Sequence, residues 1–247
     1  MSTSILEDRI AIKKLDPEGA LASAESIADQ VKQVWEEQDQ IDLSGYKNVA
    51  NIVVAGMGGS ALGADFVRHL YKQELPVSLE ISKDYTLPSY VNQNTLVILS
   101  SYSGSTEETL NCAKEAERKG AMIAVITAGN KLAQLAQEKN YPSYIINPKF
   151  NPSNQPRMAT AYNIMAILLM LKKLGLLKFE EENLHQILDV INATTQRCLV
   201  EVSQEKNQAK ILAYMFVERR PILVGAEFLE GALHISTNQL NENAKIY

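Results

Sequence analysis

The sequence contains little cysteine and little histidine. Its two cysteines, Cys112 and Cys198, lack the spacing of a metal site or a redox motif. One disulfide between them is arithmetically possible, but so few cysteines are more typical of a reducing compartment, and we expect a reduced, cytoplasmic protein. The three histidines are scattered along the chain and form no ligand cluster, so the sequence predicts no metal site.

Long apolar segments are also missing. The longest apolar run, residues 165–171, is far shorter than the roughly 20 residues that span a bilayer. Residues 1–16 contain acidic side chains and no continuous apolar block, so they do not resemble a signal peptide. We therefore expect a soluble, intracellular protein with no membrane partner.

Positive charge is in deficit, with 24 Lys and Arg against 29 Asp and Glu and a net charge of −5. A mildly acidic chain has no general attraction for phosphate backbones or anionic lipid, so nucleic acid is not an expected partner. Glycine (12) and proline (8) are too few for a fibrous or low-complexity chain. The 46% apolar and 21% charged residues indicate a globular protein, and 247 residues are enough for one large domain or two small ones.

Hydrophobic patterning divides the chain into three parts. Residues 1–46 are predicted to be helical, with an amphipathic stripe that ends at Trp35, which we interpret as a core residue rather than a ligand platform. Residues 47–155 alternate short Ile- and Val-rich runs with helical segments. The predicted strands are residues 52–55, 77–81, 95–99, 122–126 and 143–146. This alternation predicts an α/β fold, a doubly wound parallel-sheet αβα sandwich.

Residues 156–247 have a different pattern, with helices predicted at residues 159–177, 181–197, 203–217 and from 227 towards 241. Residues 162–171 are apolar on nearly every side and are expected at the centre of the packing. Only one strand is clear, at residues 221–225. A single parallel strand is not a finished sheet. It either joins the first sheet or begins a second, incomplete unit of the same kind, and we favour the second interpretation.

Two strand-to-helix turns carry the residues best suited to chemistry. GMGGS, at residues 56–60, has Gly58 and Gly59 where a ligand can approach the backbone, and Ser60 at a helix N-terminus. SSYSGST, at residues 100–106, gathers hydroxyl groups at the start of another helix; they include Ser101, Ser103 and Thr106. Backbone N–H groups, hydroxyls and the positive end of a helix dipole together suit a phosphate dianion. Neither turn matches the Walker A loop or the dinucleotide fingerprint.

Helix capping is the competing interpretation of the second turn. Ser105 and Glu108 have the spacing of a capping box, in which the serine side chain accepts from the backbone of the glutamate. Capping accounts for one or two hydroxyl groups and not for four. We therefore favour an anion site.

Four motifs occur in an order that carries a family resemblance. They are GMGGS, SYSGST, NQPR at residues 154–157 and NENAK at residues 241–245. In this order they resemble the bifunctional phosphoglucose/phosphomannose isomerases of the sugar isomerase (SIS) domain superfamily. The resemblance covers most of the chain from about residue 51 onward. It implies a small-molecule sugar phosphate as ligand, no cofactor and a homodimer.

The resemblance also implies an activity, the conversion of glucose 6-phosphate or mannose 6-phosphate to fructose 6-phosphate. Arg157 would lie beside the C1–C2 region and Glu242 would be the base. The substrate-binding residues would be Gly58, Gly59, Ser60, Ser101, Ser103 and Thr106. The reaction moves a proton between adjacent carbons through a cis-enediolate, so one carboxylate can both take and return it. A guanidinium nearby stabilises the negative enediolate oxygens.

One part of the family pattern has no match in this sequence. Family members continue past NENAK to a histidine that assists ring opening across a dimer interface, whereas this sequence ends at Tyr247. His234 lies upstream of NENAK, and we interpret it as structural; His69 and His185 are expected on helix surfaces. The alternative function is therefore a non-catalytic phosphosugar-binding module, or an inactive fragment.

Overall fold

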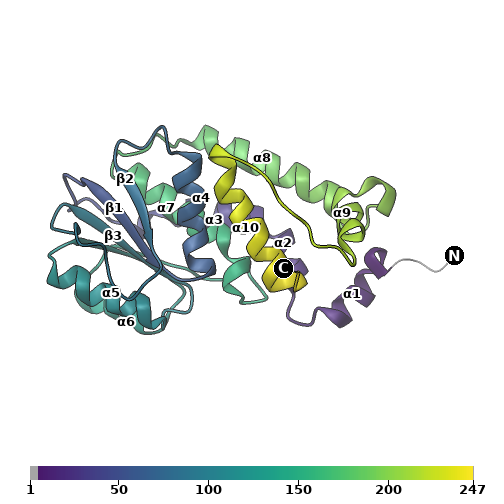
Figure 1. Ribbon diagram of the computed structural model, residues 1–247, viewed down its shortest axis with the longest axis horizontal. Coiled ribbons are helices and arrows are strands. Elements are labelled where there is room, and N and C mark those ends of the chain that lie inside the picture. Colours follow the sequence, from purple (N-terminus) through teal and green to yellow (C-terminus); the bar gives the residue numbers. More distant parts are fainter. Residues whose placement is uncertain (1–4, 247) are drawn as a thin grey trace.

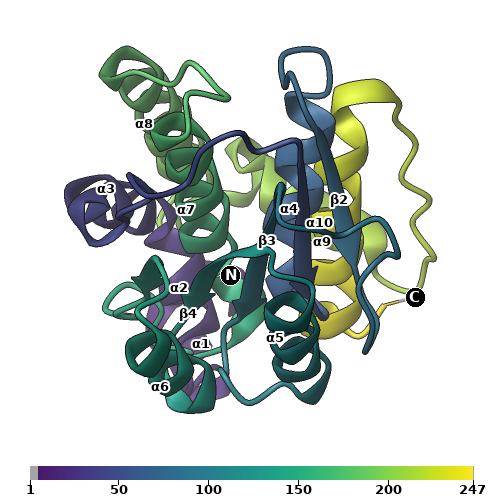
Figure 2. The same cartoon turned by 90° about the vertical axis from the view of Figure 1, so that its left-hand side faces the viewer.

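The computed structural model describes residues 5–246, in which a five-stranded parallel sheet lies between two layers of helices (Figures 1 and 2). The strands are β1 (Asn51–Gly56), β2 (Ser78–Ser82), β3 (Thr95–Ser101), β4 (Met122–Thr127) and β5 (Ser143–Ile145), in the order β2-β1-β3-β4-β5. Each neighbouring pair is parallel. The predicted doubly wound parallel sheet is confirmed.

The two faces of the sheet pack against different helices, because successive side chains of a strand point to opposite sides. Ile52 and Val54 face a core shared with α3 (Ile27–Glu36), α4 (Gly59–Leu70) and α7 (Thr160–Lys173). Val53 and Ala55 face a second core shared with α5 (Glu107–Arg118) and α6 (Asn130–Lys139). Burial on both faces explains why β1 and its neighbours are continuous apolar runs.

Helix α7 is at the centre of the larger core, as predicted for residues 162–171. It lies against α3 and α4 and is buried along most of its length. The hydroxyl of the fully buried Tyr162 donates to Gln33 at 2.8 Å and accepts from the backbone N–H of Phe150 at 3.1 Å. Its polar atom is therefore satisfied. Trp35 packs against the same core, which confirms its predicted structural role.

The remaining helices extend from this αβα body. They are α1 (Arg9–Leu15), α2 (Ala20–Glu25), α8 (Glu181–Cys198), α9 (Gln208–Phe216) and α10 (Glu230–Gln239). Short turns are η1 (Ile5–Glu7), η2 (Gln38–Gln40), η3 (Pro156–Met158), η4 (Gln204–Lys206), η5 (Glu227–Leu229) and the π-helical η6 (Leu240–Ala244). Cys112 is buried in α5, Cys198 is partly buried, and both thiols are free. None of the helices among residues 5–246 has the length and apolar character to span a bilayer.

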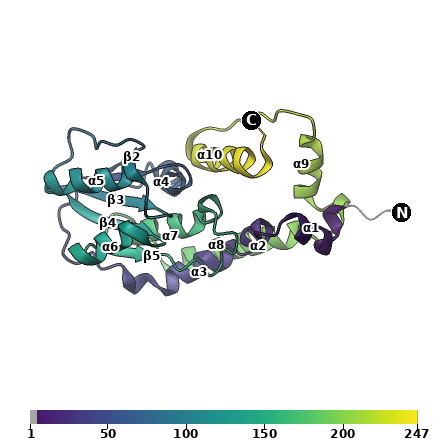
Figure 3. The same ribbon diagram turned by 90° about the horizontal axis from the view of Figure 1, so that it is seen from below.

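The predicted strand at residues 221–225 is wrong. These residues belong to an extended connection that leads from α9 back to α10 (Figure 3), and Ile222 and Val224 remain 86% and 87% exposed. A short apolar segment such as Ile222 to Val224 forms a strand only where a neighbour offers a ladder of backbone partners, and among residues 5–246 this connection has none. A second sheet is therefore not seen among residues 5–246, and α10 packs on α4 of the first unit instead. The predicted part boundaries at residues 46 and 155 stay predictions.

Candidate functional site

The carboxyl ends of β1 and β3 lie next to each other at one edge of the sheet. From these adjacent strands the chain continues to opposite sides of the sheet, β1 towards β2 and β3 towards β4. In open α/β sheets such a switch point leaves a crevice where ligands bind. The turn after β1 contains Gly58, Gly59 and Ser60, and the turn after β3 contains the hydroxyl-rich segment. The two predicted turns therefore share one edge of the sheet.

The hydroxyl groups of the second turn cluster together. Ser101 Oγ lies 2.8 Å from Thr106 Oγ1 and 3.4 Å from Ser103 Oγ, and Ser103 Oγ lies 3.4 Å from Thr106 Oγ1. Ser101 is buried, whereas Ser103 is exposed and Thr106 is partly exposed. Solvent therefore reaches the cluster from the side of Ser103 and Thr106, and Ser101 lies beneath them.

The capping alternative does not describe this turn. The N-cap of α5 is Thr106, and no side chain accepts a capping hydrogen bond there. The first N–H groups of a helix have no intrahelical partner. Because the hydroxyls contact one another instead of these N–H groups, both sets remain placed to donate to an anion at the helix N-terminus.

Gly104 allows the second turn to lie against its neighbour. Its φ of +66° is in the left-handed region, and a Cβ atom there would collide with the backbone carbonyl of Gly129. Asn130 also donates to the backbone oxygen of Ser103 at 2.8 Å. The turn between β4 and α6 thus holds the hydroxyl cluster in place.

Ser60 joins the first turn to the second. Its hydroxyl accepts from the backbone N–H of Tyr102 at 3.0 Å, and its carbonyl accepts from Ser100 Oγ at 2.8 Å. Asn163 of α7 donates to Ser100 Oγ at 2.7 Å. The two turns therefore form one connected unit braced by the central helix.

Tyr102 is a residue that the sequence analysis missed. It is buried, its hydroxyl donates to Asn154 at 3.0 Å and accepts from Asn151 at 2.9 Å, and burial raises the pKa of its phenol. These bonds join the hydroxyl-rich turn to the segment that leads to Arg157. Tyr102 is the one large side chain within SYSGST, and this difference from its neighbours could have indicated a structural role.

Arg157 lies in η3, directly over the first turn. A Cβ atom on Gly59 would come 3.2 Å from the backbone nitrogen of Arg157, so a larger residue there would push η3 away by a few tenths of an ångström. The guanidinium NH1 donates to Gln155 Oε1 at 2.9 Å and lies 3.4 Å from Glu242 Oε2. Its Nε donates to Asn243. Only 20% of the Arg157 side chain is exposed.

Glu242 is held from several sides. Its Oε1 accepts from Asn238 at 2.7 Å, one helical turn earlier, and Gln239 donates to the backbone oxygen of Arg157 at 2.6 Å. Glu242 lies in the π-helical turn η6, a conformation that is found mostly at functional sites. Its side chain is 42% exposed, so the carboxylate can be reached from solvent.

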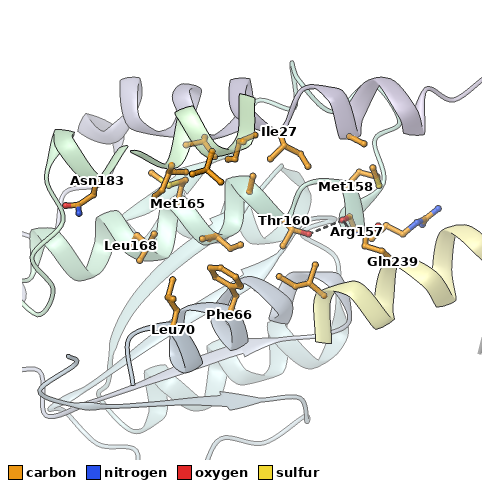
Figure 4. Close-up of a pocket in the computed structure, with 18 of the residues that line it drawn as sticks. Ile27, Phe66, Leu70, Arg157, Met158, Thr160, Met165, Leu168, Asn183 and Gln239 are labelled. Carbon is orange, nitrogen blue, oxygen red and sulfur yellow. Dashed lines mark hydrogen bonds between the residues drawn. The ribbon is translucent and has the colours of Figure 1, made fainter. Parts of the chain in front are cut away.

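A separate apolar cavity of about 820 Å³ lies beside this site, between α3, α4, α7, α8 and α10. Figure 4 shows Phe66, Leu70, Met165 and Leu168 on its walls, with Arg157 and Gln239 at the end next to α10. The hydroxyl cluster does not line it. The hydroxyl cluster and this apolar cavity are therefore distinct features, and Arg157 lies next to both.

The structure brings the predicted residues into two groups with Gly59 between them. Ser101, Ser103 and Thr106 form one group and are joined to Ser60 through Tyr102. Arg157 and Glu242 form the other, and the backbone of Arg157 lies against Gly59. A hydroxyl cluster at a helix N-terminus is suited to an anion, and it makes this edge of the sheet the candidate site.

Residues 46–173, more than half of the chain, match the SIS domain, and the chain belongs to this family. Over 205 residues it is 34% identical to the bifunctional phosphoglucose/phosphomannose isomerase of Caldicellulosiruptor bescii, and over 198 residues 31% identical to that of Thermoplasma acidophilum. These matches cover 82% and 80% of this chain. They cover 59% and 56% of the two relatives, so the chain spans less than two thirds of their length.

A solved structure of similar fold is the tagatose-6-phosphate ketose/aldose isomerase from Escherichia coli. It superposes with a TM-score of 0.57 at 17% sequence identity, over 90% of this chain and 61% of that one. At this identity the likeness concerns the fold alone.

Proposed function

We propose that the protein is a sugar-phosphate aldose–ketose isomerase that converts glucose 6-phosphate or mannose 6-phosphate to fructose 6-phosphate. The observation that carries the proposal is the Arg157–Glu242 pair, placed over Gly59 at the edge of the phosphate cradle. The 31–34% identity to bifunctional phosphoglucose/phosphomannose isomerases supports the choice of substrates.

The phosphate of the substrate binds at the N-terminus of α5. Ser101, Ser103 and Thr106 donate their hydroxyl protons to its oxygens, and the first N–H groups of the helix add further donors. Ser60 has a hydroxyl proton left to donate, because its observed bond with Tyr102 uses it as an acceptor. Glu107 and Glu108 in the first turn favour the helix dipole and have to point away from the bound anion.

The proton transfer is assigned to Glu242. In the open-chain aldose its carboxylate takes the proton from C2, the C2–H electron pair forms the C1–C2 double bond, and the carbonyl oxygen at C1 becomes the enediolate oxygen. The protonated Glu242 then returns the proton to C1. At the same time the hydroxyl proton of O2 passes to O1, so that C1 becomes a hydroxymethyl group and a carbonyl forms at C2. The guanidinium of Arg157 stabilises the enediolate charge in both halves of the reaction.

A coupled assay for fructose 6-phosphate, together with calorimetric titration of the same phosphosugars, tests this function. Turnover that disappears in Glu242→Gln supports it. Binding without turnover favours the second candidate, a non-catalytic phosphosugar-binding module. The specific observation on its side is that the SIS match, residues 46–173, contains the hydroxyl cluster and does not include Glu242.

The homodimer also remains a proposal. The surface that would support it comprises α9 and the connection to α10, where large apolar side chains are exposed; they include Leu212, Tyr214, Ile222, Val224 and Phe228. Exposed apolar surface of this extent is typical of an interface. Sedimentation at several protein concentrations distinguishes a dimer from a monomer that leaves this surface in water.

A further inference from the structure

The helix that precedes Glu242 has one main attachment to the rest of the molecule. Helix α10 follows the exposed connection of residues 217–229 and packs along α4 (Figure 1). At its start, Gly231 lies so close to the backbone of Phe66 that a Cβ atom would come 2.5 Å from Phe66 Cα. Its contacts with α4, together with the hydrogen bond from Gln239 to the backbone oxygen of Arg157, determine where its C-terminal end lies.

Two histidines and two carboxylates connect these helices. His234 Nδ1 lies 2.7 Å from Asp65 Oδ2, and His69 Nε2 lies 3.2 Å from Glu230 Oε2. His69 Nδ1 is 2.8 Å from the backbone oxygen of Asp65. His69 was expected on a helix surface, and this is wrong: its side chain is only 14% exposed, because α10 covers that face of α4.

Asp65 is the centre of this contact. Its side chain is 9% exposed, and each of its oxygens has a donor: Arg68 at 2.7 Å on Oδ1 and His234 on Oδ2. Burial acts to raise the pKa of this carboxyl, but the hydrogen bond from His234 and the charges of Arg68, His69 and His234 outweigh it, so the pKa is lowered. A buried carboxylate with these partners fixes the position of the side chain that it binds.

We propose that His234 and Asp65 are positioning residues that set the place of Glu242 relative to the phosphate cradle. The inference rests on the proposed function of Glu242 as the base. Asp65 follows Ser60 by five residues on the same helix, so it is rigidly connected to the cradle. Glu242 follows His234 by eight residues, about 12 Å along the helix at 1.5 Å per residue. Of the two side-chain contacts between α4 and α10 described above, the Asp65–His234 hydrogen bond lies nearer to Glu242 along the helix and links the two ends of the site.

An isomerase needs such a link because the substrate has a fixed length. Its phosphate is bound at one end, and the reacting carbons lie at the other. The base has to reach the C2 proton at hydrogen-bond distance, and a displacement of about 1 Å is enough to slow an enzyme by about 100-fold. The Asp65–His234 contact contributes to that precision, because it fixes the middle of α10 on α4.

The test compares three variants of the full chain. His234→Leu removes the donor to Asp65, and His234→Asn keeps one, because the asparagine Nδ2 occupies nearly the position of the histidine Nδ1. His185→Leu is the matched control, since His185 is an exposed histidine on α8 whose contact is a Glu181 carboxylate at 3.9 Å. Amide hydrogen exchange of residues 231–244 is measured together with kcat, KM and phosphosugar affinity.

We expect His234→Leu to lose protection in residues 231–244 and to lower kcat by about 10- to 100-fold with little change in KM. His234→Asn restores most of both, and His185→Leu changes neither. Unchanged protection and unchanged kcat in His234→Leu would overturn the inference. If His234→Leu does not fold, His234→Asn is compared with a double variant that lacks both the His234 imidazole and the Asp65 carboxylate. An equal loss of kcat in these two variants would overturn the inference as well.

These outcomes separate the inference from the function on which it rests. A wild-type chain without turnover contradicts the proposed function, while the exchange data still report whether His234 holds α10. A wild-type chain with turnover that is insensitive to His234→Leu contradicts the positioning role alone.

Discussion

Arg157 and Glu242 are 85 residues apart in the sequence, yet the guanidinium of one lies 3.4 Å from the carboxylate of the other. Each belongs to a different element: Arg157 is carried by η3 before α7, and Glu242 by the π-helical turn after α10. The backbone of Arg157 lies against Gly59, so this contact brings the proposed base and a cation to the proposed phosphate cradle.

Replacing Glu242 by glutamine separates binding from proton transfer. The amide keeps the size of the carboxylate but cannot take a proton from carbon, so we expect phosphosugar affinity to stay within a few-fold and turnover to fall by about 100- to 10,000-fold. Glu205→Gln, at an exposed position in η4, is the control. A Glu242→Gln variant with wild-type turnover would remove Glu242 from the mechanism.

The phosphate cradle is tested by the double variant Ser103→Ala, Thr106→Ala. Each lost hydrogen bond to a charged phosphate costs about 1.5–3 kcal/mol, so the loss of two should lower phosphosugar affinity by at least about 100-fold. Ser89→Ala, Thr194→Ala removes two exposed hydroxyls away from the site and should leave affinity unchanged. Calorimetric titration measures both, and equal affinities for the two double variants would place the phosphate elsewhere.

Two glycines with similar backbone angles provide a stability test of the second turn. Gly104 and Gly120 have φ values of +66° and +68°, but only at Gly104 would a Cβ atom meet a neighbouring backbone. Gly120→Ala should cost about 1–2 kcal/mol from the left-handed conformation alone. Gly104→Ala should cost clearly more, because the turn has to move away from Gly129. Urea unfolding compares them, and equal losses would mean that the contact with Gly129 is unimportant.

The buried phenol of Tyr102 is expected to stabilise the segment that carries Arg157. Tyr102→Phe leaves the buried amide of Asn151 without this partner, at a cost of about 1–3 kcal/mol, and removes the bond to the exposed Asn154. Thermal unfolding should show the loss, and turnover should fall with it as Arg157 becomes less well placed. Tyr214→Phe, on the exposed face of α9, is the control.

Asp65 predicts a pH dependence of stability. Its pKa is lowered by folding, so its contribution is present above the unfolded-state pKa of about 3.9 and is lost as the pH falls through the lower folded-state value. Asp65→Asn should therefore cost most near neutral pH, and its difference from wild type should shrink below about pH 4. Asp189→Asn, exposed on α8, should show no such trend. A difference that grows in acid would contradict the assignment.

The sequence was sufficient for the features that depend on local pattern. Ile- and Val-rich runs that alternate with helices predict the parallel sheet, and the two turns after β1 and β3 predict the phosphate cradle, because the carboxyl ends of parallel strands share an edge. The strand predicted at residues 221–225 is wrong because β-propensity describes a single segment and does not show whether a neighbouring strand is available to pair with it. The Asp65–His234 contact joins residues 169 positions apart, and no local pattern reports such a pairing.

The most direct test of the central proposal is proton exchange at C2 of glucose 6-phosphate in D2O, followed by nuclear magnetic resonance. If Glu242 moves a proton between C2 and C1, wild-type protein removes the C2–H signal and forms fructose 6-phosphate, and Glu242→Gln does neither while it still binds the sugar. An unchanged C2–H signal with no fructose 6-phosphate formed by the wild-type protein would contradict the account.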